Sequence, residues 1–149
     1  MHQNMENESK KQVLVGVGAI IIDENQKVLL TKRKGSHGEG SYGSLGGHLE
    51  YGESPTEALK REALEELGIE LEKIEFLVCT NLIKYNKHYL DLTFLAKIKS
   101  DEPTIMEPDK IDLVGWFDLN DLPNPLFEPV KIGIEAYLKG KNYFEINES

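Results

Sequence analysis

One stretch of the chain, residues 47–69, constrains the fold and the chemistry more than any other. It reads GHLEYGESPTEALKREALEELGI. Ser54 and Glu57 have the spacing of a capping box, and Pro55 would occupy the first helical position. Gly68 suits a left-handed cap at the other end. This pattern predicts a helix over 55–67, and a stripe spaced at i, i+4 and i+8 would face the core: Leu59, Ala63 and Leu67.

Three acidic side chains lie beside that stripe. Glu62, Glu65 and Glu66 are three and four residues apart, so on a helix they fall within an arc of roughly 100°. Like charges at this spacing repel by roughly 0.2–0.5 kcal/mol per pair, and a cation held between them would reverse the sign. Oxygen ligands without His or Cys favour Mg²⁺, with Mn²⁺ as the alternative, over zinc. A solvated acidic face is the competing interpretation for an isolated E-x-x-E-E.

Taken together, the stretch resembles the Nudix box of the Nudix (MutT-type) hydrolases, G-x5-E-x7-R-E-U-x-E-E-x-G-U, where U is a bulky aliphatic residue. The matching residues are Gly47, Glu53, Arg61, Glu62, Glu65, Glu66, Gly68 and Ile69. Ala63 departs from the preferred larger aliphatic residue at one position. The resemblance covers roughly residues 13–138 and implies the α/β/α Nudix sandwich, with a mixed β-sheet between helices.

The rest of the chain supplies strands and a second helix for such a fold. Apolar runs predict a hairpin from 13–22 and 28–30, then a hairpin from 74–83 and 89–98. A short strand over 111–117 and a helix over 129–139 follow. The predicted organisation is a flexible tail at 1–11, one Nudix domain at 12–140 and a polar C-terminal tail at 141–149.

Composition narrows the function classes. The chain has 149 residues, a formal net charge of −9 and one cysteine, which suits one domain without an intrachain disulfide. The acidic charge argues against a long nucleic-acid partner and against anionic lipid. No apolar run approaches the ~18–20 residues of a membrane span, and no signal h-region begins the chain. We therefore expect a cytoplasmic protein with no membrane partner.

The resemblance assigns roles to residues on both sides of the helix. Arg33, which precedes a glycine-rich loop, occupies the place of a phosphate-binding arginine. Gly46, Gly47 and His48 are expected to contact substrate.

Within the motif, Glu62, Glu65, Glu66 and the carbonyl of Gly47 are the expected metal ligands, while Arg61 orients the carboxylates. The general base is left open among Glu62, Glu65 and the loop residue Glu107.

The resulting hypothesis is Mg²⁺-dependent hydrolysis of a nucleoside diphosphate linked to another group. The segments KRKGS, GGHLE-x-GE and EPDK resemble the nucleoside-triphosphate diphosphatase branch, which converts a (d)NTP to a (d)NMP and pyrophosphate. The alternatives are an ADP-ribose or dinucleotide pyrophosphatase and a non-catalytic nucleotide-binding module. An RNA 5′-end pyrophosphohydrolase is disfavoured by the acidic charge. The expected partner is a nucleotide, and homodimers are common among relatives.

Overall fold

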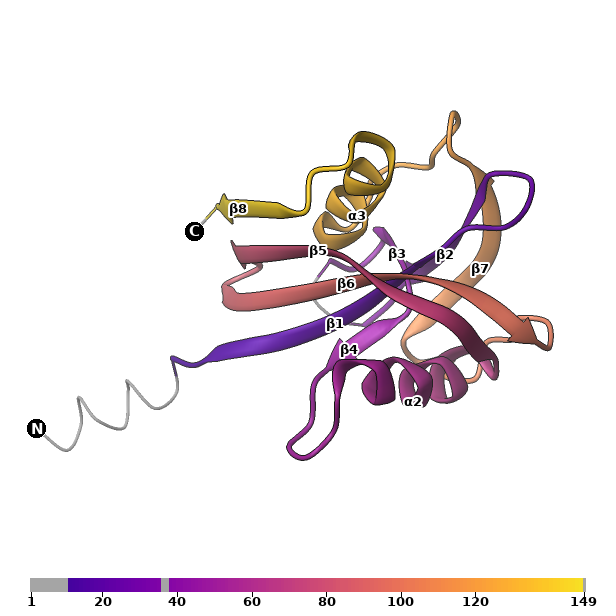
Figure 1. Cartoon of the computed structure of the whole chain (residues 1–149), viewed down its shortest axis with the longest axis horizontal. Helices are drawn as coiled ribbons and strands as arrows, with labels where there is room; N and C mark the ends of the chain where they lie inside the picture. Colours follow the sequence, from indigo (N-terminus) through magenta and orange to yellow (C-terminus); the bar gives the residue numbers. More distant parts are fainter. Residues whose placement is uncertain (1–10, 36–37, 149) are drawn as a thin grey trace, which may run out of the picture.

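In the part of the chain that the structure describes, two β-sheets and two helices make up the fold (Figure 1). The computed structural model describes residues 11–35 and 38–148. The elements in chain order are β1 (Val13–Ile21), β2 (Lys27–Arg33), β3 (Tyr42–Gly43), β4 (Gly46–His48), α2 (Pro55–Leu67), β5 (Glu70–Lys84), β6 (Lys87–Ser100), β7 (Ile111–Asp118), α3 (Glu128–Lys139) and β8 (Tyr143–Asn147).

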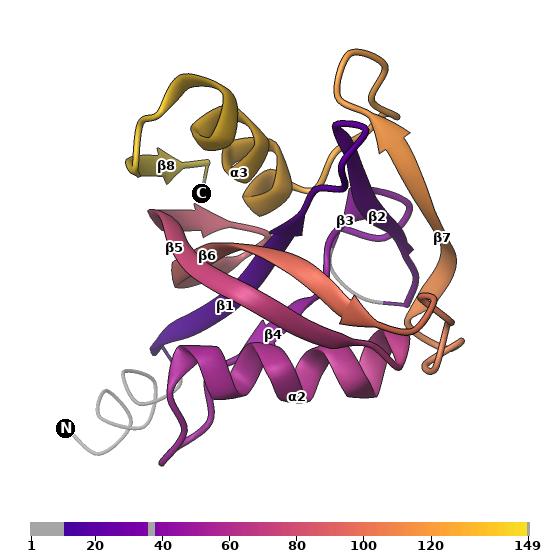
Figure 2. The ribbon, with the colours of Figure 1, turned by 45° about the vertical axis from the view of Figure 1, so that its right-hand side comes forward.

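The larger sheet is mixed and lies between the helices, as predicted. Its strand order is β4-β1-β6-β5-β8, with β1 parallel to β6 and β5 parallel to β8. Helix α2 crosses one face and α3 packs on the other (Figure 1). The smaller antiparallel sheet, β3-β2-β7, stands beside them (Figure 2). This arrangement confirms the predicted α/β class.

Helix α2 begins and ends at the predicted residues. The Glu57 backbone N–H donates to Ser54 Oγ at 3.1 Å, and the Ser54 N–H donates to Glu57 Oε1 at 3.0 Å. Gly68 caps the helix with φ 65°, a conformation that favours glycine. The predicted stripe is fully buried in the core: Leu59, Ala63 and Leu67. These local signals fix the rotation of the helix, and with it the face on which the glutamates lie.

The first predicted hairpin is wrong. Strand β1 does not pair along its length with β2, because its two edges are already occupied by β4 and β6. After a single bridge between Ile22 and Val28, the chain leaves the larger sheet and β2 joins β3 and β7 instead. An apolar run on each side of a polar turn is compatible with both outcomes. The second hairpin, β5–β6, is confirmed, and Tyr85 and Asn86 form its turn with φ 57° and 59°.

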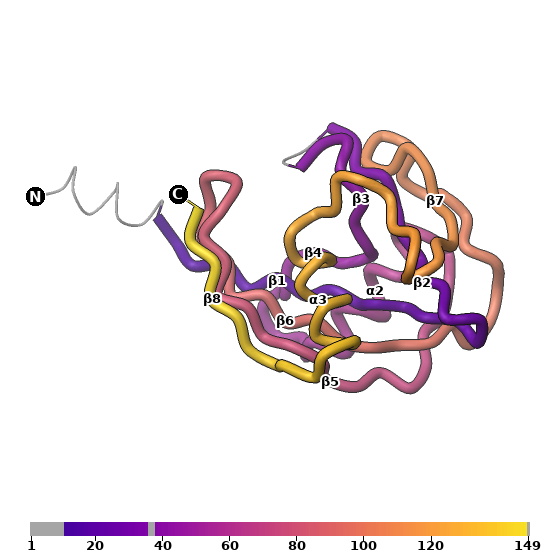
Figure 3. The backbone as a smooth tube through the Cα atoms, turned by 90° about the horizontal axis from the view of Figure 1, so that it is seen from above, coloured from indigo at the N-terminus to yellow at the C-terminus, as the bar shows by residue number. Residues whose placement is uncertain are grey.

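The predicted polar tail at 141–149 is wrong over 143–147, where β8 pairs in parallel with β5 (Figure 3). Its Phe144 and Ile146 pack with Ile132 and Ala136 of α3, so alternate residues of a polar-looking segment close the core. The predicted N-terminal tail falls almost entirely on residues 1–10, outside the described part of the chain. None of the described helices combines the length and apolar character needed to cross a membrane.

Thr80 on β5 provides a test of the core. Its side chain is 1% exposed, and among the described residues its Oγ1 has no hydrogen-bond partner. Thr80→Val keeps the shape and removes an unpaired hydroxyl, so we expect the free energy of unfolding to rise by about 1 kcal/mol. Thr93→Val is the matched control, because its hydroxyl donates to Asp91 and its loss should destabilise. Chemical denaturation measures both, and a destabilised Thr80→Val would contradict the prediction.

Candidate active site

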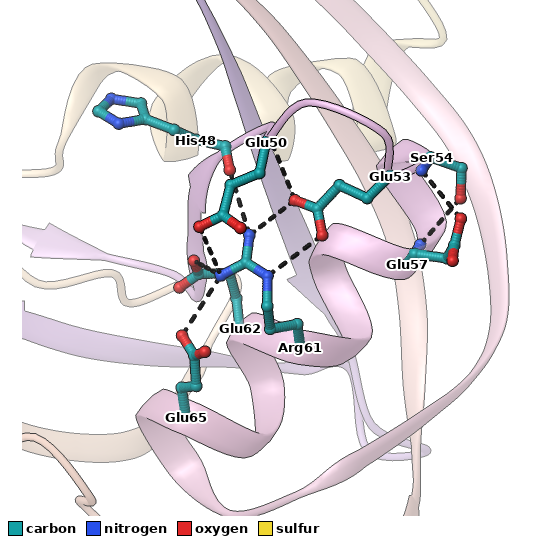
Figure 4. A network of polar contacts seen from close by, with 8 residues as sticks. All are labelled: His48, Glu50, Glu53, Ser54, Glu57, Arg61, Glu62 and Glu65. Carbon is teal, nitrogen blue, oxygen red and sulfur yellow. Dashed lines mark hydrogen bonds and ion pairs between the residues drawn. The ribbon is translucent and has the colours of Figure 1, made fainter.

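The Arg61 side chain connects the acidic residues of α2 to the loop before it (Figure 4). Arg61 Nη2 donates to Glu53 Oε1 at 2.7 Å, and Nε donates to Glu53 Oε2 at 3.2 Å. Arg61 Nη1 reaches Glu62 Oε1 at 2.7 Å and Glu65 Oε2 at 3.3 Å. Arg61 also donates to the His48 carbonyl at 3.3 Å, and its Nη1 lies 3.8 Å from Glu50 Oε1 in an ion pair. One guanidinium therefore contacts four carboxylates, the arrangement expected of an orienting residue.

Glu53 fixes the loop rather than facing the cleft. Besides its fork with Arg61, its Oε1 accepts the Glu50 backbone N–H at 2.9 Å. The hydrogen bonds from Arg61 lower the pKa of Glu53, and the bonds to Glu53 raise the pKa of Arg61. These contacts give Glu53 a structural role, because it ties the loop before α2 to Arg61.

The glycines of β4 allow two glutamates to approach the backbone closely. A Cβ on Gly47 would lie 2.5 Å from Glu62 Oε1, so any other residue here would displace that carboxylate. The Gly46 N–H donates to Glu66 Oε2 at 3.3 Å. Burial and the adjacent Glu62 carboxyl both raise the pKa of Glu66. Two crowded carboxylates with hard oxygen atoms fit Mg²⁺ or Mn²⁺, which would relieve their repulsion.

Glu107 is brought to this pair by the C-terminal end of α2. The Met106 N–H donates to the Glu66 carbonyl at 2.9 Å, and the Thr104 N–H donates to the Leu67 carbonyl at 2.9 Å. The loop thus satisfies carbonyls that a helix end leaves unpaired. The result is an acidic cleft of about 260 Å³. Its lining residues are Thr31, Arg33, Gly35, Ser44, Glu62, Glu66, Glu107, Asp109, Lys110 and Ile111.

The structure does not bring all the predicted metal ligands together. Glu65 lies outside the residues that line the acidic cleft and points to Arg61, with its side chain 50% exposed. Across the described residues, no three Asp, Glu, His or Cys side chains are already arranged around one point as metal ligands. Glu62 and Glu65 are turned toward Arg61 instead, so the complete ligand set stays a prediction.

A second cavity, the aromatic pocket, has a volume of about 360 Å³ and adjoins the acidic cleft. Four residues line both cavities: Arg33, Ser44, Glu62 and Lys110. The predicted contact residues Gly46, Gly47 and His48 line the aromatic pocket as well. Arg33 lies with its Cζ 3.9 Å from the centre of the Phe127 ring, so two cations, Arg33 and Lys110, lie where the cavities meet.

Aromatic pairs frame this pocket. His48 stacks on Tyr89 with ring centres 5.5 Å apart, and its Nε2 is 2.9 Å from the Tyr89 hydroxyl. Tyr85 stacks on Phe127 with ring centres 5.2 Å apart. Flat stacked rings beside two cations are suited to hold a nucleobase next to its phosphates.

The pocket contains a buried acid, Asp91, that sequence reasoning missed. Leu90 and Leu92 alternate along β6 as an apolar core face would, but Tyr89, Asp91 and Thr93 form the more buried face. Its register partner on β1 is Gly16, and this pairing, which the sequence alone does not reveal, is what makes Asp91 a pocket residue.

Comparison with known proteins gives a consistent result. The NUDIX domain model matches residues 13–137. An ADP-ribose pyrophosphatase of Methanocaldococcus jannaschii is 32% identical over 125 residues, covering 82% of this chain and 72% of that protein. The NAD-capped RNA hydrolase NudC of Pseudomonas entomophila is 36% identical over 119 residues, covering 80% of this chain but only 41% of that protein. A MutT NUDIX hydrolase structure from Burkholderia pseudomallei has a TM-score of 0.80 and 38% identity, with coverage of 84% and 98%.

The buried position of Asp91 predicts that the free energy of unfolding depends on pH. Burial raises its pKa to about 6 from an ordinary 3.8, so the folded state holds the proton more tightly than the unfolded state. The stability that this proton contributes is fully present below the unfolded pKa and is lost as the pH rises through the folded pKa. Relative to Asp91→Asn, the wild type should therefore lose roughly 3 kcal/mol between about pH 4 and pH 7. Urea unfolding of both proteins across this range measures the difference, and a pH-independent difference would contradict the prediction.

Proposed function

Since this chain is a member of the NUDIX domain family and is therefore a hydrolase of pyrophosphate bonds in nucleotide derivatives, we propose that its substrate is a nucleoside triphosphate. The products would be the nucleoside monophosphate and pyrophosphate. The observation that carries this proposal is the junction of the acidic cleft and the aromatic pocket at Arg33 and Lys110. A nucleoside in the aromatic pocket would place its phosphates at these cations and extend them into the acidic cleft.

The residues that line the acidic cleft favour a triphosphate over a dinucleotide as the substrate. Apart from Ile111, the described residues that line the acidic cleft are polar or glycine, and none is aromatic. A dinucleotide would present a second base, which gains most from an aromatic surface. A pyrophosphate group requires only cations and hydrogen-bond donors. The second candidate is ADP-ribose, favoured by the ADP-ribose pyrophosphatase relative.

In the proposed mechanism, the residues around the acidic cleft have two roles, holding the metal ion and binding the phosphates. Glu62, Glu66 and the Gly47 carbonyl, with Glu65 beside them, would hold Mg²⁺, which neutralises phosphate charge and makes a bound water more acidic. Arg33 and Lys110 bind and orient the phosphates.

The sequence leaves Glu62, Glu65 and Glu107 as candidates for the general base, and their positions in the structure favour Glu107. Glu65 lies outside the acidic cleft, and Glu62 Oε1 is held by Arg61. Glu107 lines the cleft from a loop, and its Oε2 makes only a long ion pair, at 3.9 Å, with Lys110 Nζ. We therefore assign proton removal from the attacking water to Glu107.

The test is hydrolysis of canonical and modified (d)NTPs, ADP-ribose and dinucleotides with Mg²⁺, with products identified by mass. Glu66→Gln should lower kcat by roughly 10²-fold or more, because it removes a preorganised charge at the site of reaction. Glu75→Gln, an exposed residue of β5, is the matched control and should keep full activity.

Turnover of triphosphates to monophosphate and pyrophosphate supports the proposal. Turnover of ADP-ribose alone would replace the substrate with the second candidate. Full activity in Glu66→Gln would contradict the assignment of the site.

A further inference from the structure

The aromatic pocket holds one acidic group that the proposed hydrolysis does not use. Asp91 is 8% exposed and lies on β6, between β1 and β5. Its Oδ2 accepts a hydrogen bond from Thr93 Oγ1 at 2.7 Å. A carboxylate buried beside a neutral hydroxyl is costly to keep, so its retention in a cavity needs a reason.

The strand beside Asp91 leaves its second oxygen uncovered. Gly16 is its register partner on β1, and a Cβ on Gly16 would lie 3.0 Å from Asp91 Oδ1. Gly16, Asp91 and Thr93 all line the aromatic pocket. The absence of a side chain at position 16 therefore gives the cavity direct access to the carboxylate, which would otherwise be capped by its neighbour.

The position of Asp91 in the pocket matches one edge of a nucleobase. The same cavity is bounded by the His48–Tyr89 and Tyr85–Phe127 stacks. The cavity also reaches Glu62 and Gly47, and Gly47 lies on β4 with β1 between it and Asp91; the phosphates are expected on that side. A nucleoside bound across β1 would carry its sugar toward Glu62 and the polar edge of its base toward Asp91.

We propose that Asp91 determines base specificity by accepting a hydrogen bond from an exocyclic amino group of the nucleobase. This inference rests on the proposed function and deepens it. An ionised carboxylate offers lone pairs only, so it attracts an amino group and repels a keto oxygen in the same place. Burial raises the pKa of Asp91 to about 6, which leaves it mainly ionised at neutral pH. The enzyme should thus prefer adenine, guanine or cytosine nucleotides over analogues that lack the amino group.

The experiment uses nucleotide pairs that differ by one amino group. ATP is compared with purine riboside triphosphate, and GTP with ITP, as kcat/KM. The corresponding monophosphates are compared by calorimetric binding, which does not require turnover. For at least one pair, the wild type should favour the amino-bearing member by roughly 10- to 100-fold, as for a hydrogen bond to a charged group.

Three variants separate specificity from structure. Asp91→Leu has the same number of side-chain heavy atoms without polar groups and should reduce the preference to less than threefold. Asp91→Asn keeps one acceptor without charge and should retain part of it. Thr80→Val alters a buried hydroxyl directly across from Asp91 on β5, outside the residues that line the pocket, and should leave the preference unchanged.

Each outcome decides one claim. Loss of the preference in Asp91→Leu, with binding of the amino-free analogue retained, supports the proposal. A preference that persists in Asp91→Leu, or a wild type without one, overturns it even if triphosphates are hydrolysed. An amino preference in monophosphate binding, with no turnover of any nucleotide, would refute the proposed function and leave the role of Asp91 standing. A wild type that binds no nucleotide overturns both.

Discussion

The whole site depends on holding several carboxylates close together, which their mutual repulsion opposes. Arg61 solves part of this problem through hydrogen bonds of 2.7 Å to both Glu53 and Glu62. The first of these ties the preceding loop to the helix, and the second directs a carboxylate toward the substrate side. Glu66 is instead held by a backbone N–H of β4, and burial together with the adjacent Glu62 carboxyl raises its pKa. A bound divalent cation would complete the neutralisation.

Absent side chains matter as much as those present. At Gly47 a Cβ would lie 2.5 Å from Glu62 Oε1, and at Gly16 it would lie 3.0 Å from Asp91 Oδ1. Both glycines are on neighbouring strands of the larger sheet. One makes room for Glu62 of α2, a proposed metal ligand, and the other makes room for Asp91 of β6, the proposed base-recognition residue. The two glycines therefore serve the two proposed tasks of the site, chemistry and recognition.

Local signals made α2 and the orienting contacts of Arg61 predictable from the sequence, whereas the long-range strand pairings were not predictable from it. The capping box, Gly68 and the stripe around Ala63 are encoded within one short segment, so α2 and the contacts of Arg61 followed from spacing. The partner of β1 and the pairing of β8 with β5 depend on which strand edges are available. Asp91 was missed for the same reason, because it becomes a pocket residue only when β1 pairs with β6 and places Gly16 beside it.

The central claim is that Glu62 and Glu66, which line the acidic cleft, form a divalent-cation site. The most direct measurement is Mn²⁺ titration followed by electron paramagnetic resonance, on the wild type and on Glu66→Gln, with Glu75→Gln as control. The account predicts saturable binding that is unchanged in the control and weakened by roughly tenfold or more in Glu66→Gln. Equal Mn²⁺ affinity in the wild type and Glu66→Gln would contradict the account, as would a wild type that shows no saturable binding.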